Sequence, residues 1–582
     1  MLRLIFTLSL ILAVLLTAGC AEPAGETADL ILHNGSIWTV DEANPEAQAV
    51  AIRDGRFVAV GTDEAVLPLA GPDTEVIDLD GHFATPGFID THVHFASAAR
   101  FLEFNIMRTG TQEAFVERVE EVIGSLPEGE WILGGFWGAY DEWAAGSAGG
   151  TGREPFTPDI ERIDSLTRNY PMFIRKFDNS AFAANTAALE AASVDPCDPQ
   201  ADGVTFDQRK EDGCATGIMY GAEGVFRLFR DAAPDAFTHA RRITQTKNAL
   251  EEIRRYGVTT VSDMSDEEQL DIYRELRQSD DLTVRVDFRY PLDEWYKLAE
   301  QGIQRGGGDA WIRLGGLKGH IDGIMGTSSA RFFEPYDHAP DNRGRWRRLM
   351  VDEQGNFVEG QFLDYMLNAD SAGLQMTVHA IGDEANSLLM DYVEDLNEQN
   401  GPSDRRFRLV HAQVIAPDDF ERLAPLGIIA EVQPYHLSDD MRWMEERIGR
   451  ERCEGAYAFK RIQDSGAMLA FGSDWPGTSA AEYPINPMLG LYAAVTRQTV
   501  TGQPEAGWFP EQRIAIEEAI RAYTYNAAYA LFEENDKGSI AVGNLADLAV
   551  LSQNLRQIDP AALLDTEVLY TIVDGKVVYR KA

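Results

Sequence analysis

The sequence has few histidines, few cysteines and few basic residues for its length. It contains 10 histidines and 4 cysteines in 582 residues, and 51 lysines and arginines stand against 94 aspartates and glutamates. The formal net charge of -43 at pH 7 argues against a nucleic-acid or anionic-membrane partner, since both require basic patches. A hydrophobic fraction of 45% is ordinary for a globular protein. The length suits one large barrel with an accessory domain.

The cysteines do not have the spacing of a metal site. No Cys-x-x-Cys pair and no mixed Cys/His motif occurs, so cysteine is a poor candidate for a metal ligand or a nucleophile. Cys197 and Cys214 flank a polar, glycine-containing stretch that is typical of a hairpin excursion. In an oxidising compartment we expect these two cysteines to form a disulfide.

An apolar run occupies residues 4–16 and is followed by small residues and Cys20. The run is too short and wrongly flanked for a membrane-spanning helix, and it indicates a secretory signal. The ending "LTAGC" resembles the bacterial lipobox, in which the cysteine becomes the lipidated first residue of the mature protein. We therefore expect residues 1–19 to be a lipoprotein signal peptide and residues 20–28 to be a tether. The protein would be exported and lipid-anchored in the bacterial cell envelope, on its periplasmic face.

The two ends of the chain differ in pattern from its middle. Residues 29–85 and 540–582 contain short β-type runs punctuated by Asn-Gly and Asp-Gly turns at hairpin spacing. Residues 86–539 alternate apolar strands with amphipathic helices, which is typical of a parallel α/β fold. We predict one composite β-sandwich built from both ends around a barrel. Nine strand candidates are more than the eight that a barrel needs, so one or two would be accessory.

The segment "GFIDTHVHF" places His92 and His94 two positions apart in a run of β-type residues. Side chains at i and i+2 of a strand share a face, so the two imidazoles project together at a separation suited to chelating a metal. Taken alone, this pair is equally compatible with two hydrogen-bonded histidines. Further ligands are needed to decide between these readings.

Four other predicted strands end in a side chain that can serve a metal site: Lys318, His379, His411 and Asp474. In a (β/α)₈ barrel the carboxyl ends of all strands converge on one mouth, where active sites lie. An isolated histidine is better explained as a hydrogen-bonded core residue. A His-x-His pair, two strand-end histidines, an aspartate and a lysine at one mouth together favour a metal centre.

These residues lie in motifs of a known family: "PGFIDTHVHF", "LKGHIDGIMGTSSARFFEPY", "VHAIGDEA", "LVHAQ", "EVQPYH", "FGSDWP" and "GNLADLAVL". The chain resembles the amidohydrolase superfamily, specifically its amidohydrolase-3 (YtcJ-like) branch, from about Asp29 to the C-terminus. The resemblance implies a TIM (β/α)₈ barrel with a composite β-sandwich formed by the N- and C-terminal segments.

The resemblance also implies a two-metal site. His92, His94 and Asp474 would bind one ion, and His379 and His411 the other. Lys318 would bridge both ions after carboxylation, because an ammonium cannot bind a cation whereas a carbamate is an anionic oxygen ligand. Zinc suits this donor set, with iron or manganese as alternatives.

Asp474 would be the catalytic acid and base for a metal-activated hydroxide. By the same resemblance, four residues would contact substrate: Asp322, Gly323, Gln433 and His436. Many relatives carry Asp-Gly-His where this chain has Asp178, Asn179 and Ser180, so the substrates of relatives do not transfer directly.

The resemblance implies a metal-dependent hydrolase that cleaves a non-peptide carbon–nitrogen bond (amide, N-acyl or N-formyl) in a small molecule. An esterase or lactonase is an alternative, since the same hydroxide attacks either carbonyl. A catalytically dead, lipid-anchored binding protein is a third reading, which the filled ligand positions disfavour. A deaminase is disfavoured because such members typically use one metal and no bridging lysine. The oligomeric state is left open, a homodimer included.

Overall fold

The computed structural model describes residues 27–138, 156–233 and 237–582. The expected signal peptide and Cys20 lie outside these ranges. Within them, no helix is both long enough and apolar enough to cross a membrane.

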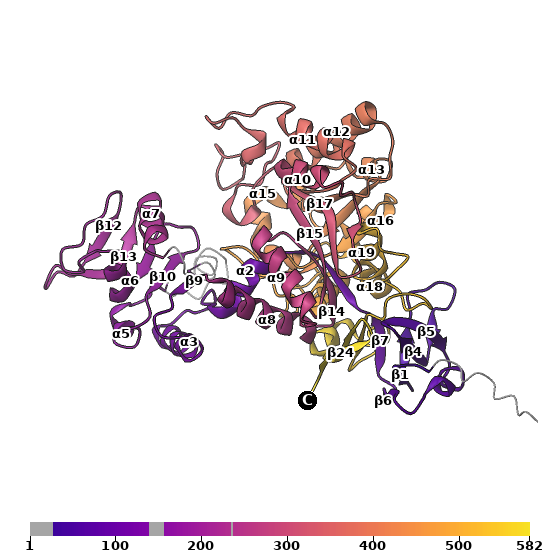
Figure 1. Ribbon diagram of the computed structural model, residues 1–582. Coiled ribbons are helices and arrows are strands. Elements are labelled where there is room, and N and C mark those ends of the chain that lie inside the picture. The colour runs from indigo at the N-terminus through magenta and orange to yellow at the C-terminus, as the bar shows by residue number, and fades with distance from the viewer. Residues whose placement is uncertain (1–26, 139–155, 234–236) are drawn as a thin grey trace, which may run out of the picture.

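A nearly closed parallel barrel occupies the middle of the chain (Figure 1). Its strands neighbour one another in the order β21-β20-β19-β18-β17-β15-β14-β8, and a parallel bridge between Val93 and Trp475 joins the two end strands. The TIM-type barrel predicted from the sequence is confirmed. The strands are β8 (Phe88–Val93), β14 (Val258–Asp263), β15 (Arg285–Pro291), β17 (Ile312–His320), β18 (Gln375–Ala380), β19 (Phe407–His411), β20 (Ile428–Val432) and β21 (Met468–Phe471).

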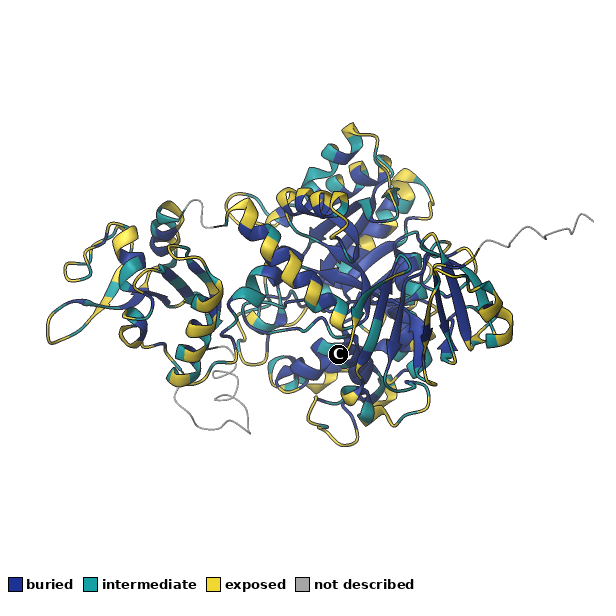
Figure 2. Ribbon diagram, turned by 60° about the horizontal axis from the view of Figure 1, so that its bottom comes forward, coloured by how far each residue is buried: buried dark blue, intermediate teal, exposed yellow. Residues whose placement is uncertain are grey.

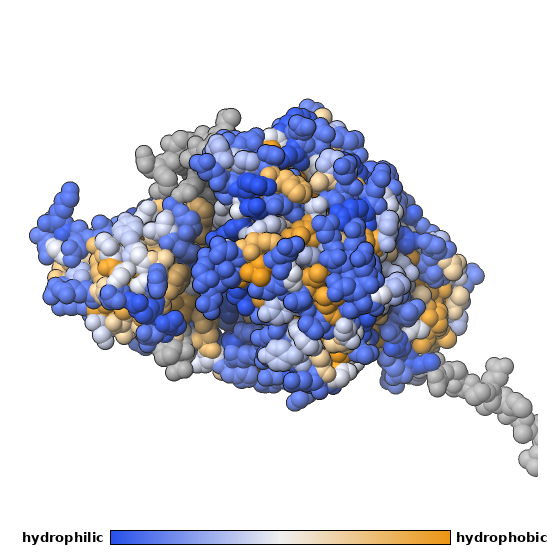
Figure 3. Space-filling view, turned by 90° about the horizontal axis from the view of Figure 1, so that it is seen from above, coloured by the Kyte–Doolittle hydropathy of each residue, from blue (hydrophilic) through white to orange (hydrophobic). Residues whose placement is uncertain are grey.

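Helices connect successive strands and cover the outside of the barrel, so the strands are buried on both faces (Figure 2). Hydrophilic side chains cover most of the face seen in Figure 3. The helices are α2 (Phe95–Glu103), α8 (His239–Arg255), α9 (Glu267–Gln278), α10 (Trp295–Glu300), α11 (Gln361–Ser371), α12 (Asp383–Asn400), α13 (Phe420–Leu423), α14 (Pro434–Asp440), α15 (Met444–Cys453), α16 (Phe459–Asp464), α17 (Pro487–Thr496), α18 (Ile516–Ala522) and α19 (Tyr525–Ala530).

The unit from α8 to β14 shows how the sequence sets these elements. The Thr238 hydroxyl caps α8 by accepting a hydrogen bond from the Arg241 backbone N–H at 3.3 Å. Leu250 and Ile253 lie on the buried face of the helix. Gly257 follows with φ +73°, a conformation that glycine adopts without strain, and β14 begins at the next residue.

Both ends of the chain build a pair of mixed sheets beside the barrel, as the hairpin turns predicted. One sheet has the order β5-β4-β1-β6 and the other β24-β23-β22-β7-β2-β3, so C-terminal strands pair with N-terminal β7. A shared apolar core joins the two sheets. Their strands are β1 (Leu30–His33), β2 (Ser36–Trp38), β3 (Glu46–Ala47), β4 (Ala49–Arg53), β5 (Arg56–Gly61), β6 (Glu75–Asp78), β7 (Phe83–Pro86), β22 (Leu548–Leu551), β23 (Val568–Val573) and β24 (Lys576–Arg580).

A further sheet of order β12-β13-β11-β10-β9 is inserted between α2 and α8, and it lies on the opposite side of the barrel from the terminal sheets (Figure 1). It has its own apolar cores and a disulfide between Cys197 and Cys214. Two of the nine predicted strands, β9 and β10, belong here. The elements are α3 (Gln112–Ser125), β9 (Ile132–Trp137), α5 (Glu161–Asp164), β10 (Met172–Lys176), β11 (Phe182–Ala184), α6 (Thr186–Ala191), β12 (Thr205–Gln208), β13 (Ala215–Tyr220) and α7 (Ala222–Ala232).

Candidate active site

The six residues expected to bind metal all lie at the carboxyl ends of barrel strands. His92 is in β8 and His94 directly follows that strand. The other four come from four further strands or the loop after one: Lys318 in β17, His379 in β18, His411 in β19 and Asp474 just beyond β21. Residues that are up to several hundred positions apart therefore meet at one mouth, as the barrel topology requires.

Asp474 lies at the centre of this group. Its Oδ1 is 3.1 Å from His94 Nε2 and 3.4 Å from His92 Nε2. One donor atom each of His92, His411 and Asp474 lie within 4.8 Å of one another. Asp474 Oδ1 is buried and has no hydrogen-bond partner in the described part of the chain. A buried carboxylate oxygen faced by imidazoles but left without a hydrogen bond fits a divalent cation.

The protonation states suit metal binding as well. Burial lowers the pKa of His92 to about 4 and that of His411 well below its ordinary value, so both rings are neutral at pH 7. Burial alone would raise the pKa of Asp474, but the neighbouring His92 and His94 outweigh burial and lower it well below its ordinary value. Neutral imidazoles and an ionised carboxylate are the forms that bind a metal.

Two of the candidate ligands have unusual backbone conformations. The φ angle is 74° at His411 and 62° at Asp474, in the left-handed region that non-glycine residues rarely adopt. Such strain persists only where the surrounding structure holds it, and it is concentrated at functional sites. At both positions the chain leaves a barrel strand, so the strained turn directs a side chain into the mouth.

Lys318 and His379 complete the group. Lys318 is buried, and its Nζ lies 3.5 Å from His92 Nε2. It has no ion pair with any other described residue, and burial lowers its pKa to about 7. The His379 ring centroid is 4.5 Å from that of His411, and His379 Nε2 lies 3.1 Å from the Gly323 carbonyl oxygen.

Glu431 in β20 orients His92, and the sequence analysis missed it. Its carboxylate accepts a hydrogen bond from His92 Nδ1 at 2.9 Å, which turns Nε2 toward Asp474. Glu431 also pairs with Arg408 at 2.5 Å and Arg289 at 3.3 Å. Burial would raise the pKa of Glu431, but these two guanidinium groups hold it below its ordinary value. The sequence does offer one indication of a role for Glu431, because it is the single charged residue in the apolar run "IIAEV".

Three of the four residues expected to contact substrate also support candidate ligands or loops, and the expectation of substrate contact stays a prediction. Gln433 Oε1 accepts a hydrogen bond from His411 Nδ1 at 2.7 Å. Asp322 accepts backbone N–H bonds from Ile381 at 3.0 Å and Gly382 at 2.9 Å, which fixes the loop after β18. Gly323 offers its carbonyl to His379 and leaves no room for a side chain, because a Cβ there would be 2.2 Å from Ser329 Oγ.

His436, the fourth of these residues, lies near Asp474, the expected catalytic acid and base. Its Nε2 is 3.9 Å from Asp474 Oδ2, and its ring stacks on Tyr483 with centroids 3.7 Å apart. Sequence reasoning missed His320, which shares the cavity with Lys318. Because His320 stands two positions after Lys318 in the same strand, the alternation used for His92 and His94 would have found it.

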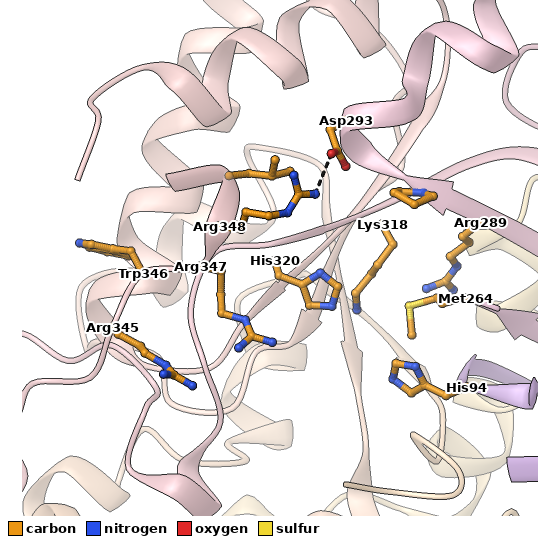
Figure 4. Close-up of a pocket in the computed structure, with 12 residues that line it drawn as sticks. His94, Met264, Arg289, Asp293, Lys318, His320, Arg345, Trp346, Arg347 and Arg348 are labelled. Carbon is orange, nitrogen blue, oxygen red and sulfur yellow. Dashed lines mark hydrogen bonds and ion pairs between the residues drawn. The ribbon is translucent and has the colours of Figure 1, made fainter. Parts of the chain in front are cut away.

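Two compartments adjoin the candidate ligands. A cavity of 570 Å³ is lined by His94, Lys318 and His320, together with several arginines (Figure 4). A much smaller compartment of 30 Å³ is bordered by His411 and Asp474. Its other lining residues are mainly apolar and include Ile324, Met325, Ile381 and Ala480.

The segment that follows β10 of the inserted sheet packs against a residue that lines the smaller compartment. Phe177 follows β10 and forms a buried apolar pair with Ala480. The Asp178-Asn179-Ser180 segment directly after it forms a turn in which Asp178 Oδ1 accepts hydrogen bonds from the Ser180 backbone and hydroxyl. The departure from the family motif therefore lies next to the mouth.

The chain belongs to the amidohydrolase family, whose model matches residues 75–579. It is 32% identical to the protein LONG AFTER FAR-RED 3 of Arabidopsis thaliana, over 96% of this chain and 92% of that protein. It is 25% identical to the N-substituted formamide deformylase of Arthrobacter pascens, over 95% of this chain and 98% of that enzyme.

Solved structures share the fold. A metal-dependent hydrolase of Pyrococcus horikoshii superposes with a TM-score of 0.70 at 24% identity, covering 91% of this chain and 99% of that protein. The atrazine chlorohydrolase TrzN of Arthrobacter aurescens, solved as a mutant with zinc and atraton, superposes with a TM-score of 0.50 at 16% identity, covering 95% of each chain. These two likenesses show the fold, and the family model shows that the protein belongs to the amidohydrolase family.

The contact between Gln433 and His411 gives a first prediction. Gln433→Ala removes the acceptor that orients His411, and we expect metal affinity to fall by roughly ten- to a hundredfold. Gln433→Glu is the matched control, because it keeps an acceptor at the same place and should retain most of the affinity. Competition with a chromogenic chelator measures both. Equal affinity in the alanine variant and the wild-type protein would show that Gln433 does not orient a ligand.

Proposed function

We propose that this protein hydrolyses a non-peptide carbon–nitrogen bond, in an amide with a small acyl group. The observation that carries the proposal is the buried Oδ1 of Asp474, which faces the His92 and His94 imidazoles but accepts no hydrogen bond from the described part of the chain. The Arthrobacter pascens relative, named as an N-substituted formamide deformylase, supports this bond class.

The residues at the mouth suit two divalent ions. His92, His94 and Asp474 would hold one, His379 and His411 the other, and Lys318 would bridge them as a carbamate. The zinc in the TrzN structure supports zinc here, and iron or manganese would fit the same donors. When bound, such ions supply Lewis acidity toward a carbonyl and lower the pKa of water.

Asp474 is the group that moves the proton. Its carboxylate is ionised and lies beside the neutral imidazole of His92, so it accepts a proton from the attacking water and later delivers it to the leaving nitrogen. His436 Nε2, 3.9 Å from Asp474 Oδ2, is close enough to position substrate beside that carboxylate. The Glu431–His92 hydrogen bond keeps the imidazole from rotating during the reaction.

The shape of the site limits the acyl group. The compartment beside His411 and Asp474 has a volume of 30 Å³, far smaller than the 570 Å³ of the other cavity at the ligands. The smaller compartment therefore favours a small acyl group such as formyl over an aromatic acyl group. The 570 Å³ cavity on the other side of the ligands has room for the amine part.

This size limit predicts the order of substrates. Among N-formyl, N-acetyl and N-benzoyl amides of one amine, we expect kcat/KM to fall with acyl size, by at least about tenfold per step because a misplaced carbonyl loses its attack geometry. Asp474→Asn should abolish hydrolysis of all three. The matching formate ester is included in the panel. Cleavage of the ester with no amide cleaved would make the enzyme an esterase, and a preference for the benzoyl amide would refute the size limit.

Lys318 gives a prediction about the metals. It is buried near His92 without an ion pair to any other described residue, which is costly for an ammonium and suits a carbamate. We expect Lys318→Ala to lose most of the bound metal and activity, and added propionate to restore part of both. Lys318→Arg should fail without rescue, since arginine stays protonated. Metal analysis of purified variants decides the matter, and two ions with full activity in Lys318→Arg would refute the bridging role.

We further propose that the protein is exported and lipid-anchored through Cys20, because "LTAGC" follows an apolar segment. Cys20→Ser should leave the protein in the soluble fraction of the envelope while its catalytic activity is retained. Fractionation of cells followed by immunoblotting tests this. Unchanged membrane association of the serine variant would rule the anchor out.

A further inference from the structure

Four of the chain's arginines gather in the six residues 343–348, in a protein whose net charge is -43. Three of these arginines line the 570 Å³ cavity beside the candidate metal ligands: Arg345, Arg347 and Arg348. In so acidic a protein, these positive charges should be balanced either by carboxylates of the protein or by a negatively charged ligand in the cavity.

Neighbouring carboxylates account for several of the positive charges. Arg348 pairs with Asp293 at 2.6 Å, the contact drawn in Figure 4, and Arg289 pairs with Glu431 at 3.3 Å. Arg343 pairs with Glu384 at 3.1 Å and does not line the cavity. Each of these guanidinium groups has a partner within the protein.

Arg345 and Arg347 differ from the others. Both are exposed to the cavity, and neither has a side-chain hydrogen bond or an ion pair with another described residue. Figure 4 shows the guanidinium of Arg347 reaching toward His320 and Lys318, with Arg345 beside it. Their two positive charges face the metal site without a counter-ion from the described chain.

The backbone holds these two side chains in place. The Arg345 N–H donates to the Ser329 carbonyl at 3.1 Å, and the Arg347 N–H donates to the Ile321 carbonyl at 2.8 Å. Between them, Trp346 forms an antiparallel bridge with Asp322. In such an extended segment positions i and i+2 share a face, so both arginines point the same way. Because Ile321 directly follows β17, their backbone is fixed relative to Lys318.

We propose that the substrate carries a carboxylate, or an anionic group of similar shape, which Arg345 and Arg347 bind in the larger cavity. This assignment rests on the proposed hydrolase function, since it places the amine part of the amide in that cavity. Guanidinium groups match a carboxylate with paired hydrogen bonds, which makes them selective for planar anions. A protein with this much negative charge repels anions at long range, so a local cationic pair is what lets an anionic substrate enter.

The test uses two metal-chelating probes of equal length, pentanohydroxamic acid and glutaric acid monohydroxamate. They differ only in the terminal carboxylate, so a difference in affinity reports on the charge. With the metal-loaded protein, calorimetry should show that the carboxylate probe binds roughly ten- to a hundredfold more tightly. The preference should shrink as salt is added, because salt screens the attraction.

Two variants make the assignment specific. In Arg345→Gln/Arg347→Gln the two probes should bind about equally, while the neutral probe keeps its wild-type affinity. Arg343→Gln is the matched control, because it removes a charge from the same segment but outside the cavity, and it should retain the preference. Equal binding of the two probes to the wild-type protein, or a preference that survives the double substitution, would overturn the proposal.

Amide substrates then separate this proposal from the proposed function. A carboxylated N-formyl amide should be hydrolysed with a lower KM than its neutral analogue, and the double substitution should remove that difference. If the wild-type protein prefers the carboxylate probe but hydrolyses neither amide, the anion site stands and the hydrolase assignment fails. If it hydrolyses both amides equally well, the anion site fails and the hydrolase assignment stands.

Discussion

The candidate site depends on one buried carboxylate, Glu431, at the centre of the barrel. It pairs with Arg408 and Arg289 and accepts the Nδ1 proton of His92. A buried charge is tolerated only when it is paired and hydrogen-bonded, so this cluster has to be assembled as a unit. The Arg408 guanidinium also donates to the Thr91 carbonyl at 2.9 Å, which ties the cluster to the strand that bears His92.

That cluster explains how a site made of residues from several strands keeps one geometry. Thr91 and His92 are in β8, Arg289 in β15, Arg408 in β19 and Glu431 in β20. Their ion pairs and hydrogen bonds cross the barrel interior, so the strand ends cannot shift independently of one another. Gln433 and Asp322 stabilise the geometry at the rim of the barrel mouth. Gln433 orients His411, and Asp322 fixes the loop after β18. The ligands therefore need little reorganisation to receive a cation.

The sequence predicted the barrel and the positions of the candidate ligands because both depend on periodicity. Alternation puts His92 and His94 on one face, and parallel strands bring their carboxyl ends to one mouth. It did not predict Glu431 as a support for His92, because that contact joins residues 339 positions apart and the lone charge in "IIAEV" does not indicate its partner. The strand β20 was missed too, since a short apolar run such as "GIIAEV" cannot be told from a helical segment by periodicity. That Arg345 and Arg347 have no ion pair with another described residue likewise depends on where distant carboxylates lie.

We infer above all that His92, His94 and Asp474 hold a metal ion at the barrel mouth, beside His411. Anomalous diffraction from crystals of the purified protein, recorded above and below the zinc absorption edge, tests it most directly, with the iron and manganese edges recorded in the same way. We expect an anomalous peak within bonding distance, about 2.0–2.2 Å, of histidine nitrogens and of a carboxylate oxygen of Asp474. A second peak beside His379, with density for a carbamate on Lys318, would complete the site. Metal-supplemented crystals with no peak among these residues, and with Asp474 hydrogen-bonded to protonated histidines instead, would contradict the account.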